Sequence, residues 1–257
     1  MDNYKFLEDS PWFIFMNHGY SPASKLLDEN NIFINSASLY LNLLEDIDTE
    51  GKTILDIGCG RGGGVKTYSE VLEFNKIHAC DYNEKFIDFC KHTHNDIEFK
   101  VCSATELTSA YNQNTFDIIT NVESSHCYFD FPTDEDLNIV YPTDNAGFLI
   151  RHVFGLNKFF NGVSSILKSG GVFCYTDAFS KDQLIELKYS NFNTKFKNIV
   201  DSDITKNVIL ACEEILDTLS TDTIPNSMVK KYMEHVAKQK IIEYKSGQKY
   251  LKFICTK

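Results

Sequence analysis

The sequence predicts an α/β fold, with a Rossmann-like, mostly parallel sheet and helices on both faces. Three observations support this prediction. A short apolar run ends in a dense glycine turn at Ile54–Gly64 (ILDIGCGRGGG), strand-like runs alternate with helical stretches as far as Asp177, and another apolar run closes the chain. Regular alternation of this kind favours parallel strands joined by right-handed crossovers.

The first 50 residues precede the first strand and are expected to form an N-terminal helical cap (1–50) over the ligand side of the sheet. Apolar side chains recur on one helical face at Leu39, Leu43, Leu44 and Ile47. Ser36 can begin this helix, because a serine hydroxyl accepts a hydrogen bond from a free amide of the first turn.

The alternating part of the chain contains five expected strands and three expected helices. The strands are Thr53–Ile57, Lys76–Cys80, Ile97–Cys102, Phe116–Val122 and Gly171–Asp177. The helices lie near Gly64–Phe74, Glu84–Thr93 and Leu149–Leu167, and the last of them has an apolar stripe at Leu149, Val153, Leu156, Phe160, Val163 and Leu167.

The pattern continues beyond the fifth strand. A helix at Asp182–Tyr189, a strand near Phe192–Val200 and two more helices are expected, followed by a final strand at Tyr250–Thr256 after the turn signal Lys245-Ser246-Gly247. With 257 residues, 43% of them hydrophobic, the chain can bury one full core, so a single domain (1–257) is expected.

One stretch interrupts the alternation. Residues 128–148 carry two Pro-Thr-Asp triplets, several acids and scattered aromatics, without a helical period. Long segments of this kind inside a compact domain are often lids or binding loops. We therefore interpret 128–148 as an inserted lid-like loop, with a surface excursion of no particular role as the alternative.

The charge balance bears on the partners of this protein. A formal net charge of -11 would repel a nucleic-acid backbone, and no local basic patch offsets it, because the lysines near residues 230–240 alternate with acids. A small-molecule substrate is expected instead, with no nucleic acid and no membrane span; a homodimer is compatible with the sequence. No signal peptide or membrane-length apolar segment is seen, which favours a cytoplasmic setting.

The cysteines and histidines do not indicate a metal site. Eight cysteines are spread through apolar runs without a C-x-x-C pair, as expected for reduced, buried thiols. His92 and His94 form an isolated H-x-H without further ligands at a suitable spacing. No metal is therefore expected.

The glycine turn is expected to bind a cofactor. Glycine accepts positive backbone dihedrals and leaves bare backbone for a ligand at Gly58 and Gly60. Asp81, 21 residues beyond Gly60, ends the second strand, where a carboxylate can accept both hydroxyls of a ribose. Gly58, Gly60 and Gly63 also satisfy G-x-G-x-x-G, so a dinucleotide and a methyl-donor cofactor both fit these residues.

Two residues are candidates for proton transfer. The fourth strand ends in NVESSHCY, with His126 beyond its carboxyl end, and Asp177 ends the fifth strand. Ligands of open α/β sheets lie beyond the carboxyl ends of the strands, where the strand order reverses, so the two side chains are expected to converge there. A histidine oriented by a carboxylate is a good general base near neutral pH.

Six segments carry a specific resemblance over nearly the whole chain. They are MNHGY, LDIGCGRGGG, NVESSHCY, LKSGGVFCYTDAF, DITKNVILA and YKSGQKYLKF. Together they resemble the class I S-adenosylmethionine-dependent small-molecule methyltransferases typified by phthiotriol dimycocerosate methyltransferase and rebeccamycin sugar O-methyltransferase. The resemblance implies a seven-stranded sheet with the last strand antiparallel beside the fifth, and S-adenosyl-L-methionine as cofactor.

The resemblance also implies roles for individual residues. His126 and Asp177 would handle the substrate proton, Tyr20 would close over the cofactor, and the acid Asp56 would help to hold the loop. Relatives often have Asp-Ala after the third strand, whereas this chain has Ser103-Ala104, so backbone or Thr105 would replace the acid at the adenine. The candidate cofactor-binding residues are Tyr20, Asp56, Gly58, Cys59, Gly60, Gly62, Asp81, Tyr82, Ser103, Ala104, Thr105, Asn121 and Glu123.

The expected function is methyl transfer to a hydroxyl of a small or lipid-like natural product, with His126 as general base. Twenty phenylalanines and 13 tyrosines are consistent with an apolar acceptor pocket. C- or N-methylation of a small molecule, a methyltransferase-fold protein that binds the cofactor without methyl transfer, and a nicotinamide-dependent dehydrogenase remain as alternatives.

Overall fold

The computed structural model describes residues 10–128, 145–220, 224 and 227–257, without the side chains of 145–149. Residues 1–9 of the expected N-terminal cap and 129–144 of the expected lid-like loop lie outside the described residues. The interpretation of 128–148 as a lid therefore stays a prediction. Its last four residues already belong to a helix, which begins at Asn145.

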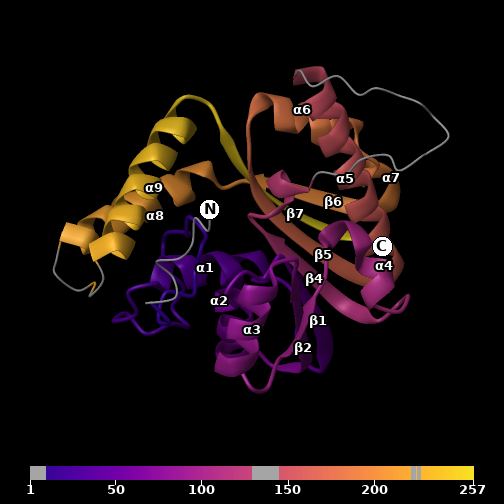
Figure 1. Ribbon diagram of the computed structural model, residues 1–257, viewed down its shortest axis with the longest axis horizontal. Coiled ribbons are helices and arrows are strands. Elements are labelled where there is room, and N and C mark those ends of the chain that lie inside the picture. Colours follow the sequence, from indigo (N-terminus) through magenta and orange to yellow (C-terminus); the bar gives the residue numbers. More distant parts are fainter. Residues whose placement is uncertain (1–9, 129–144, 221–223, 225–226) are drawn as a thin grey trace.

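The described residues form one seven-stranded sheet in the order β3-β2-β1-β4-β5-β7-β6 (Figure 1). The strands are β1 (Lys52–Ile57), β2 (Phe74–Asp81), β3 (Glu98–Val101), β4 (Phe116–Val122), β5 (Leu167–Phe179), β6 (Lys197–Asp203) and β7 (Lys249–Thr256). The first five pair in parallel, whereas β7 is antiparallel to both β5 and β6. The predicted fold class, including the antiparallel last strand beside the fifth, is confirmed.

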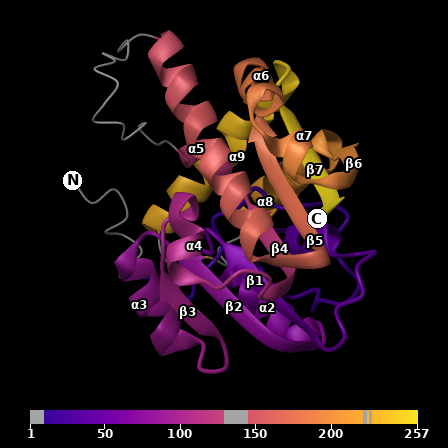
Figure 2. The same ribbon diagram turned by 90° about the vertical axis from the view of Figure 1, so that its right-hand side faces the viewer.

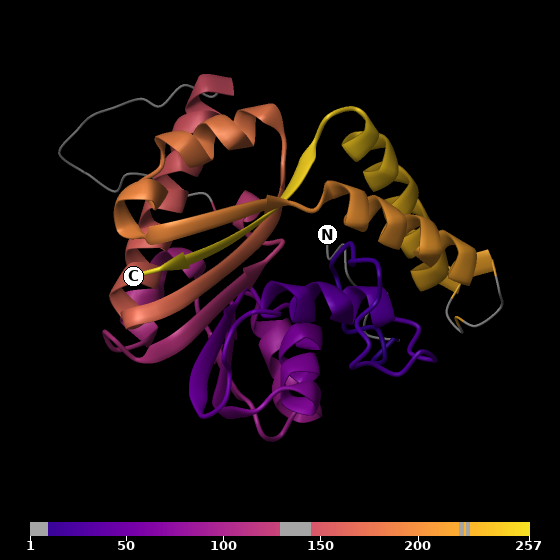
Figure 3. The same ribbon diagram turned by 180° about the vertical axis from the view of Figure 1, so that it is seen from behind.

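Helices cover both faces of this sheet. They are α1 (Ile34–Leu43), α2 (Gly63–Val71), α3 (Glu84–Thr93), α4 (Leu107–Ala110), α5 (Asn145–Ile166), α6 (Lys181–Tyr189), α7 (Phe192–Lys195), α8 (Thr205–Ser220) and α9 (Ser227–Lys245), with short 3-10 turns η2 (Ala104–Glu106) and η3 (Ser125–Cys127). Figure 2 shows α5 lying across one face, with α6 and α7 beside it. Figure 3 shows α8 and α9 as a hairpin that extends beyond the sheet above the N-terminal region.

Alternation along the central strands divides the core into two clusters. Successive residues of a strand point to opposite faces, so Ile54 and Ile118 join one cluster and Leu55 and Ile119 the other. The first cluster also receives side chains from α1, α2, α3, α8 and α9, and the second from α4, α5, α6 and α7. Because both faces are covered, the central strands are apolar almost throughout, as the sequence indicates.

Several boundaries differ from the sequence prediction. The helix expected to reach Phe74 ends at Val71, where the chain turns into β2, and β5 begins at Leu167, four residues before Gly171. Ser36 does not cap α1: the helix starts at Ile34 after Phe33, and the Ser36 carbonyl accepts a hydrogen bond from Asn17 inside the helix. The apolar face was identified correctly, since Leu39, Leu43 and Leu44 are buried. The periodicity locates the buried face of a helix, whereas the position of its first turn here depends on contacts with the preceding segment.

The strand expected near Phe192–Val200 begins later than predicted. Residues Phe192–Lys195 form the helical turn α7, and β6 starts at Lys197. This turn buries Phe192 against the rings of Phe160 and Phe253, which lie on other elements. The aromatic contacts of Phe192 with other elements therefore decide the local conformation of this segment.

None of the helices among the described residues is both long and apolar enough to cross a membrane.

Candidate active site

The glycine loop joins β1 to α2 at the point where the strand order reverses. Gly58, Gly60 and Gly62 have φ of +74°, +53° and +82°, which L side chains rarely adopt. The amides of Gly58 and Cys59 donate to the Cys80 carbonyl at 2.8 and 3.0 Å, which fixes the loop against the end of β2. The sharp turn expected from the sequence is thus built on backbone conformations that glycine allows.

The surroundings of Gly58 and Gly60 differ. A Cβ placed on Gly58 would lie 2.4 Å from the hydroxyl of Ser124, so this glycine is required for close packing. Among the described residues, a Cβ on Gly60 would meet only the sulfur of Met16, at 3.8 Å. Gly60 therefore borders open space, and a ligand can lie against its bare backbone.

Asp81, the last residue of β2, contacts the same loop. Its Oδ2 accepts from the Gly60 amide at 2.9 Å and its Oδ1 from the Asn83 amide at 2.9 Å. Each carboxylate oxygen has two acceptor positions, so both can also accept ligand hydroxyls. The side chain is largely buried, which raises the pKa of the Asp81 carboxyl, while the adjacent Tyr82 is exposed.

Asp56 lies beneath the loop rather than at its surface. The carboxylate is buried and accepts a hydrogen bond of 2.7 Å from the Thr120 hydroxyl on β4. Burial raises the pKa of Asp56 to about 7. The bond found for this acid therefore links β1 to β4, and no hydrogen bond from it to the glycine loop is seen among the described residues.

The candidate residues for the adenine lie at the turn η2. The Ser103 hydroxyl accepts from the Thr105 amide at 3.3 Å, and the two hydroxyls lie 3.0 Å apart. Ala104 is buried between them. The hydroxyl groups of Ser103 and Thr105 are thus within hydrogen-bond distance of each other. Cys59 is buried as well, and its thiol donates weakly to the Gly60 carbonyl at 3.8 Å.

Asn121 connects the end of β4 to the glycine loop. Its side-chain amide lies 2.8 Å from the Ile57 carbonyl, 2.7 Å from the Ser124 hydroxyl and 2.8 Å from the Tyr128 hydroxyl. Within the described part of the chain, the buried Oδ1 of Asn121 has no hydrogen-bond partner. A buried acceptor without a partner is costly, so this atom suits a donor group on a bound ligand.

His126 and Asp177 lie together, as predicted. The Nδ1 of His126 is 3.3 Å from Oδ1 of Asp177, and the histidine side chain is 45% exposed whereas the aspartate is 1% exposed. Hydrogen bonds with Asp177 and Cys127 raise the pKa of His126 to about 11. A half-exposed imidazole at the end of β4 is thus held by a buried carboxylate at the end of β5.

Asp177 stays ionised although it is buried. Burial alone would raise the pKa of its carboxyl, but hydrogen bonds from His126 and Ser125 lower this pKa below its ordinary value. Oδ2 accepts from the amide and the hydroxyl of Ser125 at 2.9 and 2.7 Å, and Oδ1 accepts from the Ala178 amide at 2.8 Å. A carboxylate with this many donors can carry a stable negative charge opposite the imidazole.

A second polar cluster surrounds Glu123, which follows β4 directly. Its carboxylate accepts from the His18 amide at 2.8 Å and from the Tyr250 hydroxyl at 2.5 Å, and it faces the His18 ring. Burial raises the pKa of Glu123 to about 7 and lowers that of His18 to about 3. Glu123 has φ +49°, an uncommon conformation for this residue type.

The cluster was only partly predicted. Glu123 was a candidate, but His18, Tyr244 and Tyr250 were not, although His18 and both tyrosines lie inside segments that carry the family resemblance. The His18 ring is 2.8 Å from the Tyr244 hydroxyl. Tyr20, two residues on, is tied to α1 by its amide, which donates to the Asn35 carbonyl at 2.9 Å. Its expected closure over the cofactor stays a prediction.

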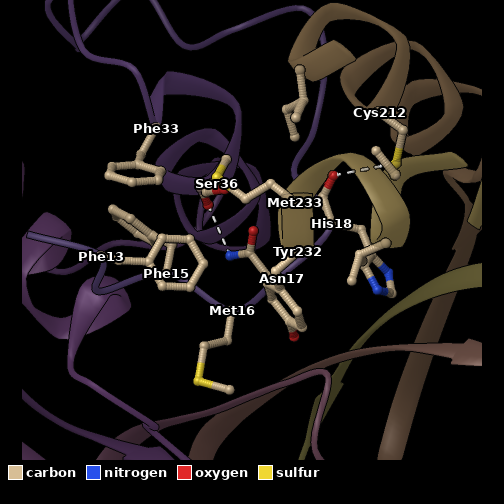
Figure 4. A pocket seen from close by; sticks show the side chains of 13 residues that line it. Phe13, Phe15, Met16, Asn17, His18, Phe33, Ser36, Cys212, Tyr232 and Met233 are labelled. Atoms are coloured by element: carbon tan, nitrogen blue, oxygen red, sulfur yellow. Dashed lines mark hydrogen bonds between the residues drawn. The ribbon is translucent and has the colours of Figure 1, made fainter. Parts of the chain in front are cut away.

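An apolar pocket opens beside this cluster (Figure 4). Its wall is formed by the N-terminal segment, α1 and the α8–α9 hairpin. Figure 4 shows the rings of Phe13, Phe15 and Phe33 on one side, and Cys212 and His18 on the other. The lining also includes Ile215, Tyr232, Met233, Val236 and Ala237. We call this space the apolar pocket.

Residues 48–232 match the family model described as a methyltransferase domain. The chain is 27% identical over 232 residues to a fatty-acid O-methyltransferase of Mycolicibacterium smegmatis, covering 86% of this chain and 74% of that protein. It is 24% identical over 209 residues to a phthiotriol/phenolphthiotriol dimycocerosates methyltransferase of Mycobacterium leprae, covering 80% of this chain and 64% of that protein.

A solved structure with a similar fold is geranyl diphosphate C-methyltransferase of Streptomyces coelicolor, in complex with Mg²⁺, geranyl-S-thiolodiphosphate and S-adenosyl-L-homocysteine. The TM-score is 0.60 at 14% identity, covering 94% of this chain and 87% of that chain. At this level of identity the likeness concerns the fold.

Proposed function

Because this chain belongs to the methyltransferase-domain family, we propose that it transfers the methyl group of S-adenosylmethionine to an oxygen of a small or lipid-like acceptor, with His126 as the base. The expected family and enzyme class are confirmed: the protein is an S-adenosylmethionine-dependent methyltransferase. The nicotinamide-dependent alternative is thereby set aside.

The residues of the glycine loop fit this cofactor. Gly60 offers bare backbone beside open space, Asp81 has acceptor positions for two ribose hydroxyls, and the unpartnered Oδ1 of Asn121 suits an ammonium donor. When bound, S-adenosylmethionine supplies a methyl group on a sulfonium leaving group. The chain then has to orient the acceptor oxygen, exclude water and accept one proton. Orientation contributes about 7 to 11 kcal/mol in well-aligned systems.

The pairing of His126 with Asp177 carries the proposal. His126 is the half-exposed member, so it can reach an acceptor, and the buried Asp177 stabilises the imidazolium as a proton arrives on the imidazole. The raised pKa of His126 has a consequence for a hydroxyl acceptor. Only the neutral imidazole can take the hydroxyl proton, so the rate should increase with pH across the range below about 11.

The apolar pocket supports a lipid-like acceptor. It is lined mainly by aromatic and aliphatic side chains and reaches His18, which bonds Glu123 at the end of β4. The cavity has a free volume of about 40 Å³, so the end of an acyl chain would bury apolar surface there, at about 0.8 kcal/mol per CH₂ group. The similarity to a fatty-acid O-methyltransferase supports the same acceptor class.

A second candidate acceptor is a fatty-acid carboxylate. It is favoured by the high pKa of His126, because an imidazolium binds an anionic oxygen that needs no base. The two acceptors require opposite protonation states of His126. With a carboxylate, the rate should stay constant at neutral pH and fall only as pH approaches about 11.

The test uses radiolabelled S-adenosylmethionine with two acceptors of equal chain length, one a fatty alcohol or hydroxy lipid and the other a fatty acid. Rates are measured from pH 6 to 10 for the wild type, His126→Gln and His126→Lys. For a hydroxyl acceptor, His126→Gln should lower kcat by about 10²- to 10⁴-fold, and His126→Lys should not restore it at neutral pH. For a carboxylate, His126→Lys should restore binding that His126→Gln weakens.

The product identifies the acceptor atom. A methyl ester is released by alkali, a methyl ether is not, and the NMR shift of the new methyl group distinguishes oxygen from carbon and nitrogen. Methylation of carbon or nitrogen would contradict the proposal. So would tight cofactor binding without methyl transfer to any of these acceptors, because that result is expected of a protein that uses only the methyltransferase fold.

A further inference from the structure

A buried histidine–glutamate pair packs against the turn η3, which carries His126. His152 is on α5 and Glu186 is on α6, and both side chains are 4% exposed. The Nδ1 of His152 is hydrogen-bonded to Oε2 of Glu186, and its Nε2 lies 3.0 Å from the Ser125 carbonyl. Neither residue belongs to the cofactor loop or to the His126–Asp177 pair.

The partners of His152 constrain where protons lie. A carbonyl oxygen only accepts, so Nε2 must carry a hydrogen and donate it to Ser125. Nδ1 faces a carboxyl group, and one proton must lie between the two. The His152–Glu186 pair therefore holds two protons in all and is neutral overall, as an imidazolium beside a carboxylate or an imidazole beside a carboxylic acid. In both forms the bond to Ser125 is donated by Nε2.

Ser125 is held on both sides. Its amide and hydroxyl donate to Asp177 at 2.9 and 2.7 Å, and its carbonyl accepts from His152 and from the Tyr128 amide at 3.0 Å each. The Tyr175 hydroxyl is 2.5 Å from the Ser125 hydroxyl, and it must donate there because that hydroxyl donates to Asp177. Ser125 immediately precedes His126, so any rotation of this peptide would also move the base.

We propose that His152, supported by Glu186, is a positioning residue for methyl transfer: its bond to the Ser125 carbonyl fixes the turn that keeps His126 opposite Asp177. The role of His152 in methyl transfer rests on the function proposed above. A buried ionisable pair costs desolvation that an apolar pair would avoid, so packing alone gives no reason for these two residue types here. The need to fix the direction of the Ser125 carbonyl gives such a reason.

Two substitutions separate the bond of His152 with Ser125 from its bond with Glu186. His152→Gln places a donor where Nε2 was and keeps the bond to Ser125. His152→Asn places its donor where Nδ1 was, keeping Glu186 and losing Ser125. His92→Gln, on an exposed position of α3, is the matched control for a histidine substitution far from the site.

The first measurement is the NMR titration of the His126 imidazole, made without cofactor or acceptor. In His152→Asn the pKa of His126 should fall by about one unit or more, because the turn no longer holds His126 opposite Asp177, and kcat should fall about tenfold or more with the KM for S-adenosylmethionine unchanged. His152→Gln and His92→Gln should stay within about threefold of the wild type.

Equal effects of His152→Asn and His152→Gln on kcat, with the His126 titration unchanged, would show a packing role only and overturn the proposal. If His152→Asn does not fold, the second variant is the double substitution His152→Phe, Glu186→Leu, which replaces the buried pair by an apolar one of similar volume. It removes the donor to the Ser125 carbonyl, so the pKa of His126 should still fall, and an unchanged titration of His126 would overturn the proposal. A normal NMR result with no methyl transfer to any acceptor would count against the proposed function alone.

Discussion

At Gly60, the effect of an added side chain on the free energy of unfolding can be separated from its effect on cofactor affinity. Gly60 has φ +53°, and an added methyl group would meet nothing closer than the Met16 sulfur at 3.8 Å. Gly60→Ala should therefore destabilise the fold by only about 1 to 2 kcal/mol, through backbone strain. The same methyl group enters the space expected for the cofactor, so affinity for S-adenosylmethionine should fall by at least about tenfold.

The chain provides a matched control for this substitution. Gly170 has φ +74° with no atom within 4 Å of an added Cβ, and it lies at the start of β5, far from the loop. Gly170→Ala should show a similar loss in urea denaturation and no change in calorimetric titration with the cofactor. Equal loss of cofactor affinity in both variants would contradict a cofactor position against the backbone of Gly60.

The His126–Asp177 pair should also be visible in the pH dependence of stability. The pKa of His126 is raised from 6.5 to about 11 by its bonds with Asp177 and Cys127, so its protonated form stabilises the folded state. This contribution is complete below the unfolded pKa near 6.5 and is lost as pH rises towards 11. Because the imidazole is 45% exposed, solvent screening reduces the effect.

The measurement compares the wild type with His126→Gln in urea at pH 6, 8 and 10. The difference in unfolding free energy should be largest at pH 6 and shrink steadily above it. The contribution of Asp177 to stability changes with pH in the opposite direction. The pKa of its carboxyl is lowered in the folded state, so its stabilisation is present above the unfolded pKa of 3.8 and is lost as pH falls through the folded pKa. A difference that is constant from pH 6 to 10 would argue against the raised pKa.

Among the residues of the site, the sequence predicts those whose position follows from the order of the strands. His126 follows β4 and Asp177 lies near the end of β5, and these strands are parallel neighbours, so the topology brings the two residues together. His152 and Glu186 were not found, because they lie on two helices, and only the packing of α5 and α6 against the turn η3 brings them to Ser125. Glu123 was expected at the cofactor mouth, yet the bonds seen for it go to His18 and Tyr250.

At the scale of single elements, α6 offers a test of local stability apart from chemistry. It begins with a capping box: the Ser180 hydroxyl accepts from the Gln183 amide at 3.2 Å, and the Gln183 side chain accepts from the Ser180 amide at 2.8 Å. Ser180→Ala should lower the unfolding free energy by about 1 kcal/mol. Equilibrium denaturation measures this, and kcat should stay the same because Glu186 lies in the second turn of the helix.

Ser69→Ala is the control for the loss of a serine hydroxyl. Ser69 is exposed on α2, and its hydroxyl only donates to the Lys66 carbonyl of the same helix. It should cost much less than the loss of a cap. If Ser180→Ala lowered kcat without lowering stability, α6 would have a direct part in catalysis that the capping bonds do not explain.

The elements themselves were largely predictable. Every predicted strand and helix of the alternating part is present, because periodicity and the glycine turn report the two-sided burial of a parallel sheet. The errors fall where partners remote in sequence decide the outcome. Phe192–Lys195 is expected to begin a strand but forms a helical turn, in which Phe192 packs against Phe160 and Phe253, and Ser36 does not mark the start of α1.

At the scale of the whole molecule, the apolar pocket is made by parts of the chain that are distant in sequence. The N-terminal segment and α1 supply Phe13, Phe15 and Phe33, while the α8–α9 hairpin supplies Met233 and its neighbours. Met233→Trp should fill the pocket and lower kcat/KM for long-chain acceptors by about tenfold, with less effect on short ones and none on cofactor affinity. Rates with acceptors of increasing chain length measure this.

Met228→Trp is the matched control, since Met228 is 61% exposed on the same helix. It should leave the chain-length preference unchanged. An equal effect of both substitutions would indicate that the hairpin acts through its general stability. Loss of short and long acceptors alike in Met233→Trp would place the acceptor chain outside the pocket.

The position of β7 has a consequence for synthesis on the ribosome. β6 lies at the edge of the sheet, and β7, which reaches from 249 to 256, separates it from β5. During translation β1 to β5 can pair as they emerge, but β6 must wait until residues 249–256 have left the exit tunnel. Meanwhile β5 presents an unpaired edge that invites pairing with another nascent chain. Codons that slow elongation between residues 203 and 249 would therefore prolong the period in which a chaperone has to shield that edge.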